Sequence, residues 1–318
     1  MDVTEAAGLA EIYGNGLGVV FGDYDADGDL DMFVANDQMA DQLWRNEGDG
    51  TFVDVGEMVG VARDPMGGVR AGMGVDAADV DDDGDLDLLV VHLAREKDGF
   101  FRNRGSHFVE ETTRVGIGLG TFRMTRFGVG FHDFDGDGHL DLFVANGRVN
   151  LMMAALDELD PYAEPNTLMR GTGRGTWEVV SPAGGTVMPR MATSRGAAFG
   201  DVNGDGAPDV VVVNRDGPAD LFINCAPRSG RSLTLRLEDE EGALAQGARA
   251  SLSLGDRRIR RDVKPAYSYC SASDSRLHFG LGEMAEVEAV EVTWPDGSTE
   301  TFGPLPAGAH VLRRGTGR

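Results

Sequence analysis

The stretch Asp23-Tyr24-Asp25-Ala26-Asp27-Gly28-Asp29-Leu30-Asp31 is the first of four copies of one nine-residue pattern. The later copies occupy residues 79–87, 133–141 and 201–209. Each copy has oxygen-bearing side chains at positions 1, 3, 5 and 9 and glycine at position 6. Such a pattern is typical of a tight loop around a hard cation, because the glycine permits the turn that aims the carbonyl of position 7 inward.

We therefore predict up to four Ca²⁺ sites, each formed by side chains at four positions and by one backbone carbonyl. The predicted ligands are, loop by loop, Asp23, Asp25, Asp27, Asp31 and the carbonyl of Asp29; Asp79, Asp81, Asp83, Asp87 and the carbonyl of Asp85; Asp133, Asp135, Asp137, Asp141 and the carbonyl of His139; and Asp201, Asn203, Asp205, Asp209 and the carbonyl of Ala207. Mg²⁺ fits less well, because it tolerates crowded all-protein shells poorly.

An EF-hand begins with the same Asp-x-Asp-x-Asp-Gly pattern but needs a bidentate glutamate at position 12. Position 12 is valine in all four copies, namely Val34, Val90, Val144 and Val212. We therefore exclude an EF-hand and expect each loop to lead into a strand. The other alternative is an acidic turn without an ion. Four copies in register argue against it, because clustered carboxylates repel one another without a cation.

The loops recur at intervals of 56, 54 and 68 residues, which is typical of a propeller or solenoid. In the first repeat, apolar runs at 16–22 and 30–36 flank the loop, and two more β-rich runs follow at 42–46 and 48–53. The same order predicts a four-stranded antiparallel unit in each repeat, with the loop between its first two strands. Because such a unit cannot bury both faces alone, we predict an all-β fold built as a β-propeller.

The number of blades has two interpretations. Residues 2–9 match residues 54–61, so the chain begins in mid-repeat, while the last repeat lacks a fourth strand. Either residues 2–9 close a four-bladed ring against the last repeat, or this is a partial propeller with an incomplete N-terminus. The shortness of 2–9 favours the second. The longer third interval contains an insertion at 149–161, a short helix or loop that is either part of a binding face or a packing plug.

We place the propeller in residues 1–228 and a second, small all-β domain in residues 229–318. Strands of alternating polarity at 233–237, 248–254, 257–263, 289–294 and 310–313 predict a β-sandwich or half-barrel there. The basic cluster at 257–261 is interpreted as a solvated strand face. Cys225 and Cys270 allow either a disulfide or two buried free thiols.

The formal charge of −24 argues against binding of nucleic acid or of an anionic membrane surface. The four loops hold 18 of the 53 acidic residues, so much of the acidity is clustered at the predicted sites. No apolar run is long enough to predict a membrane span, and the N-terminus lacks the features of a signal peptide. Motifs for nucleophilic, zinc-dependent and nucleotide chemistry are absent, so we predict no catalytic residues and no enzyme activity.

With the repeats aligned, residues 1–225 resemble the FG-GAP (or VCBS) repeats of integrin-alpha-type propellers, through Phe21-Gly22-Asp23 and Phe199-Gly200-Asp201. The C-terminal stretch resembles an ASPIC/UnbV domain through residues 277–282 and Trp294-Pro295-Asp296-Gly297. Seven blades are usual in propellers of this kind, which favours the partial-propeller interpretation. The resemblance implies Ca²⁺ in the loops, with weaker binding in the fourth, where Asn203 offers a neutral oxygen and Pro208 departs from the pattern.

The resemblance also implies a role in binding or cell adhesion. The location would be extracellular or at the cell surface, and the partner a protein or glycan that the sequence does not identify. We expect the partner surface near the 149–161 insertion. The alternative function is an accessory or catalytic propeller that acts on polysaccharide, which would need a pair of carboxylates in a cleft outside the loops.

Overall fold

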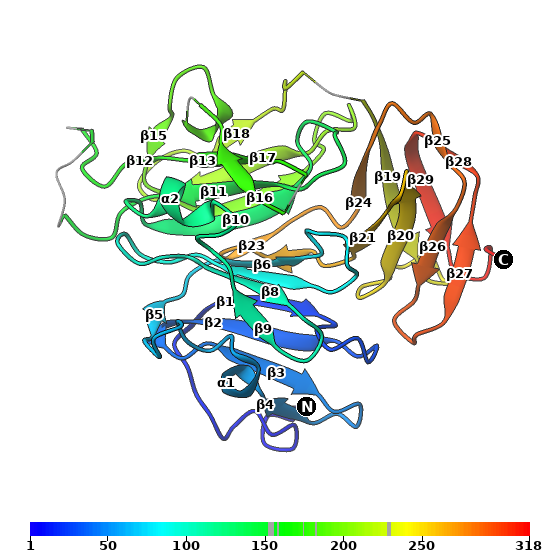
Figure 1. Cartoon of the computed structure of the whole chain (residues 1–318), viewed down its shortest axis with the longest axis horizontal. Coiled ribbons are helices and arrows are strands. Elements are labelled where there is room, and N and C mark those ends of the chain that lie inside the picture. The colour runs from blue at the N-terminus through cyan, green and yellow to red at the C-terminus, as the bar shows by residue number, and fades with distance from the viewer. Residues whose placement is uncertain (152–155, 158, 174, 182, 228–229) are drawn as a thin grey trace.

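The computed structural model describes residues 1–151, 156–157, 159–173, 175–181, 183–227 and 230–318 (Figure 1). Strands dominate this part of the chain. Its helices are the short α1 (Gly56–Val59) and α2 (Ile117–Thr121) and the 3-10 turn Ala183–Gly185. None of its helices could cross a membrane. The predicted domain boundary at 228/229 falls on residues outside the described part and stays a prediction.

Each of the first three repeats forms one four-stranded antiparallel blade, as predicted. The first blade contains β1 (Gly16–Gly22), β2 (Asp31–Met39), β3 (Gln42–Asn46) and β4 (Phe52–Asp54). The second contains β6 (Val75–Ala78), β7 (Asp87–Val90), β8 (Gly99–Asn103) and β9 (Phe108–Glu110). The third contains β10 (Arg126–His132), β11 (Asp141–Asn146), β13 (Thr167–Gly171) and β14 (Trp177–Val179). The fourth blade has three strands, β16 (Ser194–Gly200), β17 (Asp209–Asn214) and β18 (Asp220–Phe222).

Repeated glycines let the first strands of neighbouring blades approach closely. A Cβ on Gly18 would clash with the carbonyl of Met73, and one on Gly74 with the carbonyl of Phe127. One on Gly128 would clash with the backbone of Ala197 in the next blade. The apolar second strands then lie inside this stack, where β7 and β11 are buried along their whole length. Blade-to-blade packing therefore explains the glycines that recur five residues before each loop, here Gly18, Gly74 and Gly128.

The place beside the fourth blade is taken by a hairpin from the C-terminal part of the chain. This hairpin, residues 264–274, contains β22 (Ala266–Tyr267) and β23 (Ser271–Ala272). A Cβ on Gly196, the fourth glycine of the series, would meet the Ser271 hydroxyl and the carbonyl of Tyr269. Figure 1 shows β23 close to β6, among the blades rather than with the other C-terminal strands.

Hydrogen bonds tie the hairpin to the first strands of two further blades. Ser268 exchanges backbone hydrogen bonds with Val75 (2.7 and 3.2 Å), and its hydroxyl accepts one from the amide of Val129 (2.9 Å). The ring of Tyr267 stacks on Phe199 with centroids 6.1 Å apart, and its hydroxyl lies 2.8 Å from Nε2 of His132. The hairpin is therefore part of the propeller core.

The N-terminal residues pack on the first blade. The carbonyl of Ala7 accepts a hydrogen bond from the amide of Phe52, at the start of β4 (2.9 Å). The linker after the second blade packs on the third blade in the same way, because the carbonyl of Val115 accepts a hydrogen bond from the amide of Trp177 at the start of β14. Among the described residues, no strand pairs with the free edge of β18. The interpretation in which residues 2–9 close the ring against the last repeat is therefore wrong, and the four blades form a partial propeller.

The C-terminal sandwich consists of two sheets that enclose a separate core, as predicted. One sheet has the order β24 (Leu277–Gly282), β19 (Arg231–Glu238), β29 (Gly308–Arg313), with β19 and β29 parallel. The other has the order β21 (Arg257–Asp262), β20 (Arg249–Leu254), β26 (Val290–Thr293), β27 (Thr299–Phe302). Five short strands complete the fold, namely β5 (Arg70–Ala71), β12 (Glu164–Pro165), β15 (Met191–Ala192), β25 (Glu286–Val287) and β28 (Leu305–Pro306). Trp294 is buried in the sandwich core.

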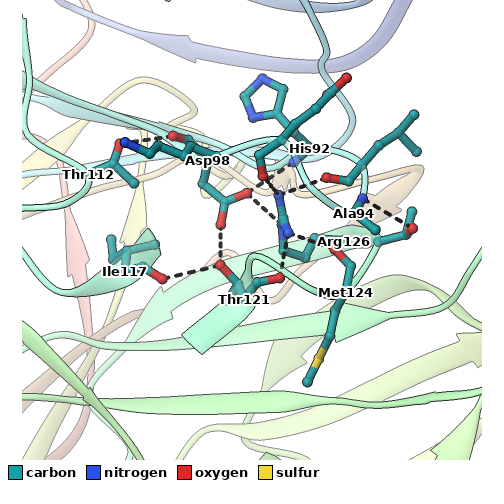
Figure 2. Close-up of polar contacts among 12 residues, drawn as sticks. His92, Ala94, Asp98, Thr112, Ile117, Thr121, Met124 and Arg126 are labelled. Atoms are coloured by element: carbon teal, nitrogen blue, oxygen red, sulfur yellow. Dashed lines mark hydrogen bonds and ion pairs between the residues drawn. The ribbon is translucent and has the colours of Figure 1, made fainter. Parts of the chain in front are cut away.

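A fully buried ion pair fixes the second blade to the third (Figure 2). Nε of Arg126 lies 2.7 Å from Oδ1 of Asp98, and both side chains are almost completely buried. The remaining guanidinium nitrogens of Arg126 donate to four backbone carbonyls, those of Leu93, Glu96, Thr121 and Met124. The hydroxyl of Thr121 donates to the other oxygen of Asp98 (2.6 Å). A buried pair with this many partners is costly to break from one side, by about 3–5 kcal/mol.

The structure also bears on the two cysteines and on the 149–161 insertion. Cys225 and Cys270 are free and both are exposed, so they form neither a disulfide nor a buried pair. In the 149–161 insertion, residues 152–155 and 158 lie outside the described part, and the remaining residues are bends and coil. Its end is tied to the fourth blade, because the Thr193 hydroxyl donates to the carboxylate of Asp160 (2.6 Å).

Candidate metal centres

Three of the four loops bring carboxylates together as the sequence predicts. In each of these loops, one oxygen atom from each of three aspartates lies within 4.8 Å of the others. The groups are Asp23, Asp25 and Asp27; Asp79, Asp81 and Asp83; and Asp133, Asp135 and Asp141. Position 12 of each loop lies inside β2, β7, β11 or β17, which confirms that the loop leads into a strand.

The aspartate at position 1 supplies the clearest sign that the first two loops fit a cation. Asp23 and Asp79 are 7 % and 2 % exposed. In each of them one buried carboxylate oxygen, Oδ1, has no hydrogen-bond partner. An unpartnered buried oxygen is costly, and a hard cation held by the neighbouring carboxylates would satisfy it. The donor set, all oxygen and mostly anionic, is the set that Ca²⁺ prefers.

Burial raises the pKa of several loop carboxyl groups. It raises the pKa of Asp31 and Asp79 to about 7, of Asp133 to about 6, and of Asp87 and Asp141 to about 8. Neighbouring carboxylates add to the rise in every one of these groups, for example Asp82 at Asp79. A bound cation would act in the opposite direction, because it stabilises the ionised form.

The aspartate at position 9 fastens the loop to the end of the third strand. Asp31 accepts hydrogen bonds from the amides of Tyr24 (3.0 Å) and Asn46 (2.8 Å), one at each oxygen. Asp141 and Asp209 accept the equivalent pairs in the third and fourth repeats. In the second repeat Asp87 accepts from Asn103 and from the Arg102 guanidinium. Since each carboxylate oxygen has a second lone pair, coordination by position 9 stays a prediction.

The fourth loop is satisfied mainly by its own hydrogen bonds. Both oxygens of Asp201 accept from backbone amides of the loop, at 2.7–3.1 Å. The Asn203 amide nitrogen donates to Asp205 (3.0 Å), which its carboxylate counterparts in the other loops could not do. These contacts agree with the expectation of weaker cation binding at this site.

Sequence reasoning missed two arginines on the third strands of the blades. Arg102 lies 2.9 Å from Asp81 and 2.7 Å from Asp87, and Arg170 lies 2.8 Å from Asp135 and 3.0 Å from Asp137. The signal was present, because the first three repeats have arginine at this position and the fourth has Ile223. These guanidinium groups reduce the repulsion among the loop carboxylates.

The interpretation of residues 257–261 as a solvated face is wrong for three of its four arginines. Nε of Arg261 is buried, and its guanidinium lies over the ring of Phe279. Nε of Arg257 lies 2.6 Å from the carboxylate of Asp82, and Arg260 donates to the carbonyl of Gly84 (2.6 Å). Arg258 is more exposed and pairs with Glu291 at the mouth of a cavity that Asp82 and Gly84 also line. The reason is that β21, which contains the cluster, lies against the loops of the blades.

The fold and the site together define a class of protein, a partial β-propeller whose blades each contain an acidic loop between their first two strands. The chain matches the model of the FG-GAP-like repeat over residues 23–90, 79–144 and 133–212. It belongs to this family. Residues 239–315 match the ASPIC and UnbV model, so the two resemblances predicted from the sequence are confirmed.

Among named proteins, the chain is similar to cartilage acidic protein 1 from several vertebrates. It is 27% identical to the human protein over 314 residues, which is 93% of this chain and 43% of that protein. It is 26% identical to the protein from Xenopus tropicalis over 307 residues, which is 91% of this chain and 43% of that protein. The chain thus spans less than half the length of these relatives.

Two solved structures are similar to parts of this chain. One is a lectin from Agrocybe aegerita that recognises non-reducing terminal N-acetylglucosamine, with a TM-score of 0.34, 16% identity, and coverage of 66% of this chain and 53% of the lectin. The other is a rhamnogalacturonan lyase from Bacillus licheniformis, with a TM-score of 0.36, 13% identity, and coverage of 92% and 57%. No functional conclusion follows from likenesses at this level.

Proposed function

We propose that this chain is a Ca²⁺-stabilised binding or adhesion module that works outside the cell and has no catalytic role. The observation that carries the cation part is the unpartnered buried oxygen of Asp23 and of Asp79, each set among neighbouring carboxylates. Loops of this type in extracellular modules bind Ca²⁺ with dissociation constants on the order of 10⁻⁴ to 10⁻³ M, which suits extracellular calcium. The named relatives are cartilage proteins, which supports the same location.

The cavity between the blades and the hairpin is small. Asp76, His132, Lys264 and Tyr267 contribute to its lining, and its volume is about 80 Å³. Sites for small molecules are usually about 300–1,000 Å³. This cavity is therefore too small to hold a sugar residue.

We place the partner surface at the 149–161 insertion. Its described residues expose apolar side chains, namely Val149, Leu151, Leu156 and Leu159, the last at 98 %. Exposed apolar groups gathered in one segment are typical of protein-binding sites. The partner is accordingly a protein or a glycoprotein of the matrix.

The test is a binding screen of the full chain against arrays of matrix proteins and of glycans in 2 mM Ca²⁺, where the concentration is about that implied by the expected affinity. We expect a matrix-protein hit that is lost in the double variant Leu156→Ser/Leu159→Ser with an unchanged melting temperature. Met66→Ser is the matched control, because Met66 is equally exposed (96 %) and lies in the first half of the chain. Hits that survive the double variant would contradict the placement, and turnover of any glycan on the array would contradict the non-catalytic role.

A further inference from the structure

All four loops contact the C-terminal sandwich. In the first loop, Nη1 of Arg249 lies 3.0 Å from Oδ2 of Asp23. In the second, Arg260 donates to the carbonyl of Gly84 (2.6 Å). In the third, Arg257 donates to the carbonyl of Gly138 (2.9 Å).

The fourth loop is held by three donors on the other sheet of the sandwich and beside it. Nε2 of His278 and the hydroxyl of Ser232 both donate to the carbonyl of Gly206, at 2.9 and 2.8 Å. Arg276 donates to the carbonyl of Asp201 (3.1 Å). The sandwich is therefore docked on the row of loops as a whole.

The atom that the sandwich contacts is the same in three of the loops. It is the carbonyl of the glycine at position 6, in Gly84, Gly138 and Gly206. These glycines have φ of +94°, +85° and +81°, which only a wrapped loop imposes. The position-6 carbonyl therefore points at its donor on the sandwich only while the loop keeps this backbone conformation.

Asp23 links the sandwich to the cation position even more directly. Its Oδ2 receives Arg249 from the sandwich and its Oδ1 is unpartnered, while one of its oxygens lies within 4.8 Å of oxygens of Asp25 and Asp27. One carboxylate therefore faces both groups. Arg249 fixes the orientation of Asp23, as an outer partner does for a metal ligand.

We propose that cation binding by the loops and docking of the C-terminal sandwich are coupled, so that filled loops hold the sandwich in place and the docked sandwich raises the cation affinity of the loops. The inference rests on the proposed cation binding. An empty loop contains carboxylates that repel one another, so it opens and turns the position-6 carbonyl away from its donor. Because coupling of this kind is reciprocal, removing a donor must weaken cation binding by the same factor.

The hairpin of residues 264–274 keeps the sandwich attached to the blades when the contacts between the loops and the sandwich are lost. It lies between β21 and β24 of the sandwich and is anchored in the blades by the Lys264–Asp76 ion pair and by Tyr267. Loss of cation therefore loosens the sandwich without releasing it. The experiment must therefore measure how strongly the backbone amides of the docked strands are protected from hydrogen exchange. We do not expect the sandwich to separate from the blades.

The experiment is hydrogen exchange of the full chain, with and without 10 mM Ca²⁺, alongside Ca²⁺ titration calorimetry. We expect Ca²⁺ to increase the protection of residues 249–262 and 276–282 under conditions in which the blades stay folded. We also expect Arg257→Met to lower the Ca²⁺ affinity by about 5-fold or more, the usual lower bound for coupled sites. Arg236→Met is the matched control, because Arg236 lies on the sandwich and pairs with Glu238 of its own strand β19, so the affinity of this variant should equal that of the parent chain.

Two results would overturn the inference, and they are distinguishable. If Ca²⁺ binds but protection of 249–262 stays constant and Arg257→Met binds like the parent chain, the coupling is wrong and the proposed cation binding stands. If calorimetry detects no Ca²⁺ binding at all, both are wrong. The exchange measurement on the parent chain needs no variant, so a poorly folding Arg257→Met protein would not prevent the test.

Discussion

Position 1 and position 7 of the loops contribute to the candidate sites in different ways. Asp79 presents an unpartnered buried oxygen, and an oxygen of Asp83 lies within 4.8 Å of one of the Asp79 oxygens. Asp85 at position 7 is expected to bind through its carbonyl only. These roles followed from the sequence because they depend on spacing within nine residues. The arginines that face the loops from other strands did not, because they lie up to 226 residues away along the chain.

The two kinds of ligand can be separated by a matched pair of variants. Asp83→Asn removes a side-chain ligand, so we expect it to reduce the stabilisation by 10 mM Ca²⁺ by about 1.4–2.7 kcal/mol, the value for one site at ten to a hundred times its dissociation constant. Asp85→Asn removes the same charge and keeps the carbonyl, so the Ca²⁺ effect should persist. Urea unfolding with and without Ca²⁺ measures both. Equal losses in the two variants would show that only the net charge of the loop matters.

The raised pKa values predict how the cation-free chain responds to pH. Asp87 and Asp141 have pKa values raised from 3.8 to about 8 by burial, so the folded state binds more protons than the unfolded state between these values. Their contribution to stability is therefore complete below about pH 4 and is lost as the pH rises toward 8. We expect the free energy of unfolding in Ca²⁺-free buffer to fall from pH 5 to pH 8. High salt, which screens the general charge repulsion, should leave much of this fall.

Added Ca²⁺ gives the control for the pH series. At 10 mM it should remove most of the fall, because the cation stabilises the ionised carboxylates. A cation-free stability that rises between pH 5 and pH 8 would contradict the assignment of these buried carboxyl groups.

At the scale of elements, the strands next to the loops were predictable and the hairpin was not. The predicted third strand at 42–46 coincides with β3, because its apolar residues and flanking turns mark it locally. Residues 264–274 are rich in serine and lack alternation, so the pattern predicts no strand there. The two short strands pair with each other, and contacts with distant blade residues, such as that of Ser268 with Val129, 139 residues away, hold the hairpin in place.

Tyr267 tests whether the hairpin belongs to the propeller core. Its ring is 7 % exposed and is packed with the buried residues of the blades. Tyr267→Ala should lower the free energy of unfolding by about 3–5 kcal/mol, as loss of a large buried aromatic ring does. Tyr267→Phe removes the hydroxyl, which contacts His132 and Ser273, and should cost about 0.5–1.5 kcal/mol for each hydrogen bond lost.

Chemical denaturation followed by tryptophan fluorescence is the measurement, since Trp177 lies in the propeller and Trp294 in the sandwich. A small effect of Tyr267→Ala, within about 0.5 kcal/mol, is the range of ordinary surface substitutions and would show that the hairpin is peripheral.

At the scale of the whole molecule, the loops combine two tasks. They join the first two strands of each blade, and they form the surface on which the C-terminal sandwich lies. The sequence predicted the first task from the repeat. It could not predict the second, because the docking of two separately patterned β domains is set by side chains such as Arg257, whose pattern on β21 fits a solvated strand equally well.

The most direct test of the central claim, that the loops are Ca²⁺-filled structural joints, is the thermal unfolding of the Ca²⁺-depleted full chain as a function of added Ca²⁺. At 10 mM the account predicts a stabilisation of about 1.4–2.7 kcal/mol per occupied site, hence a melting temperature that rises progressively through the millimolar range. Equal Mg²⁺ should give a much smaller rise. A melting temperature that does not change with millimolar Ca²⁺, or that rises equally with Mg²⁺, would contradict the account.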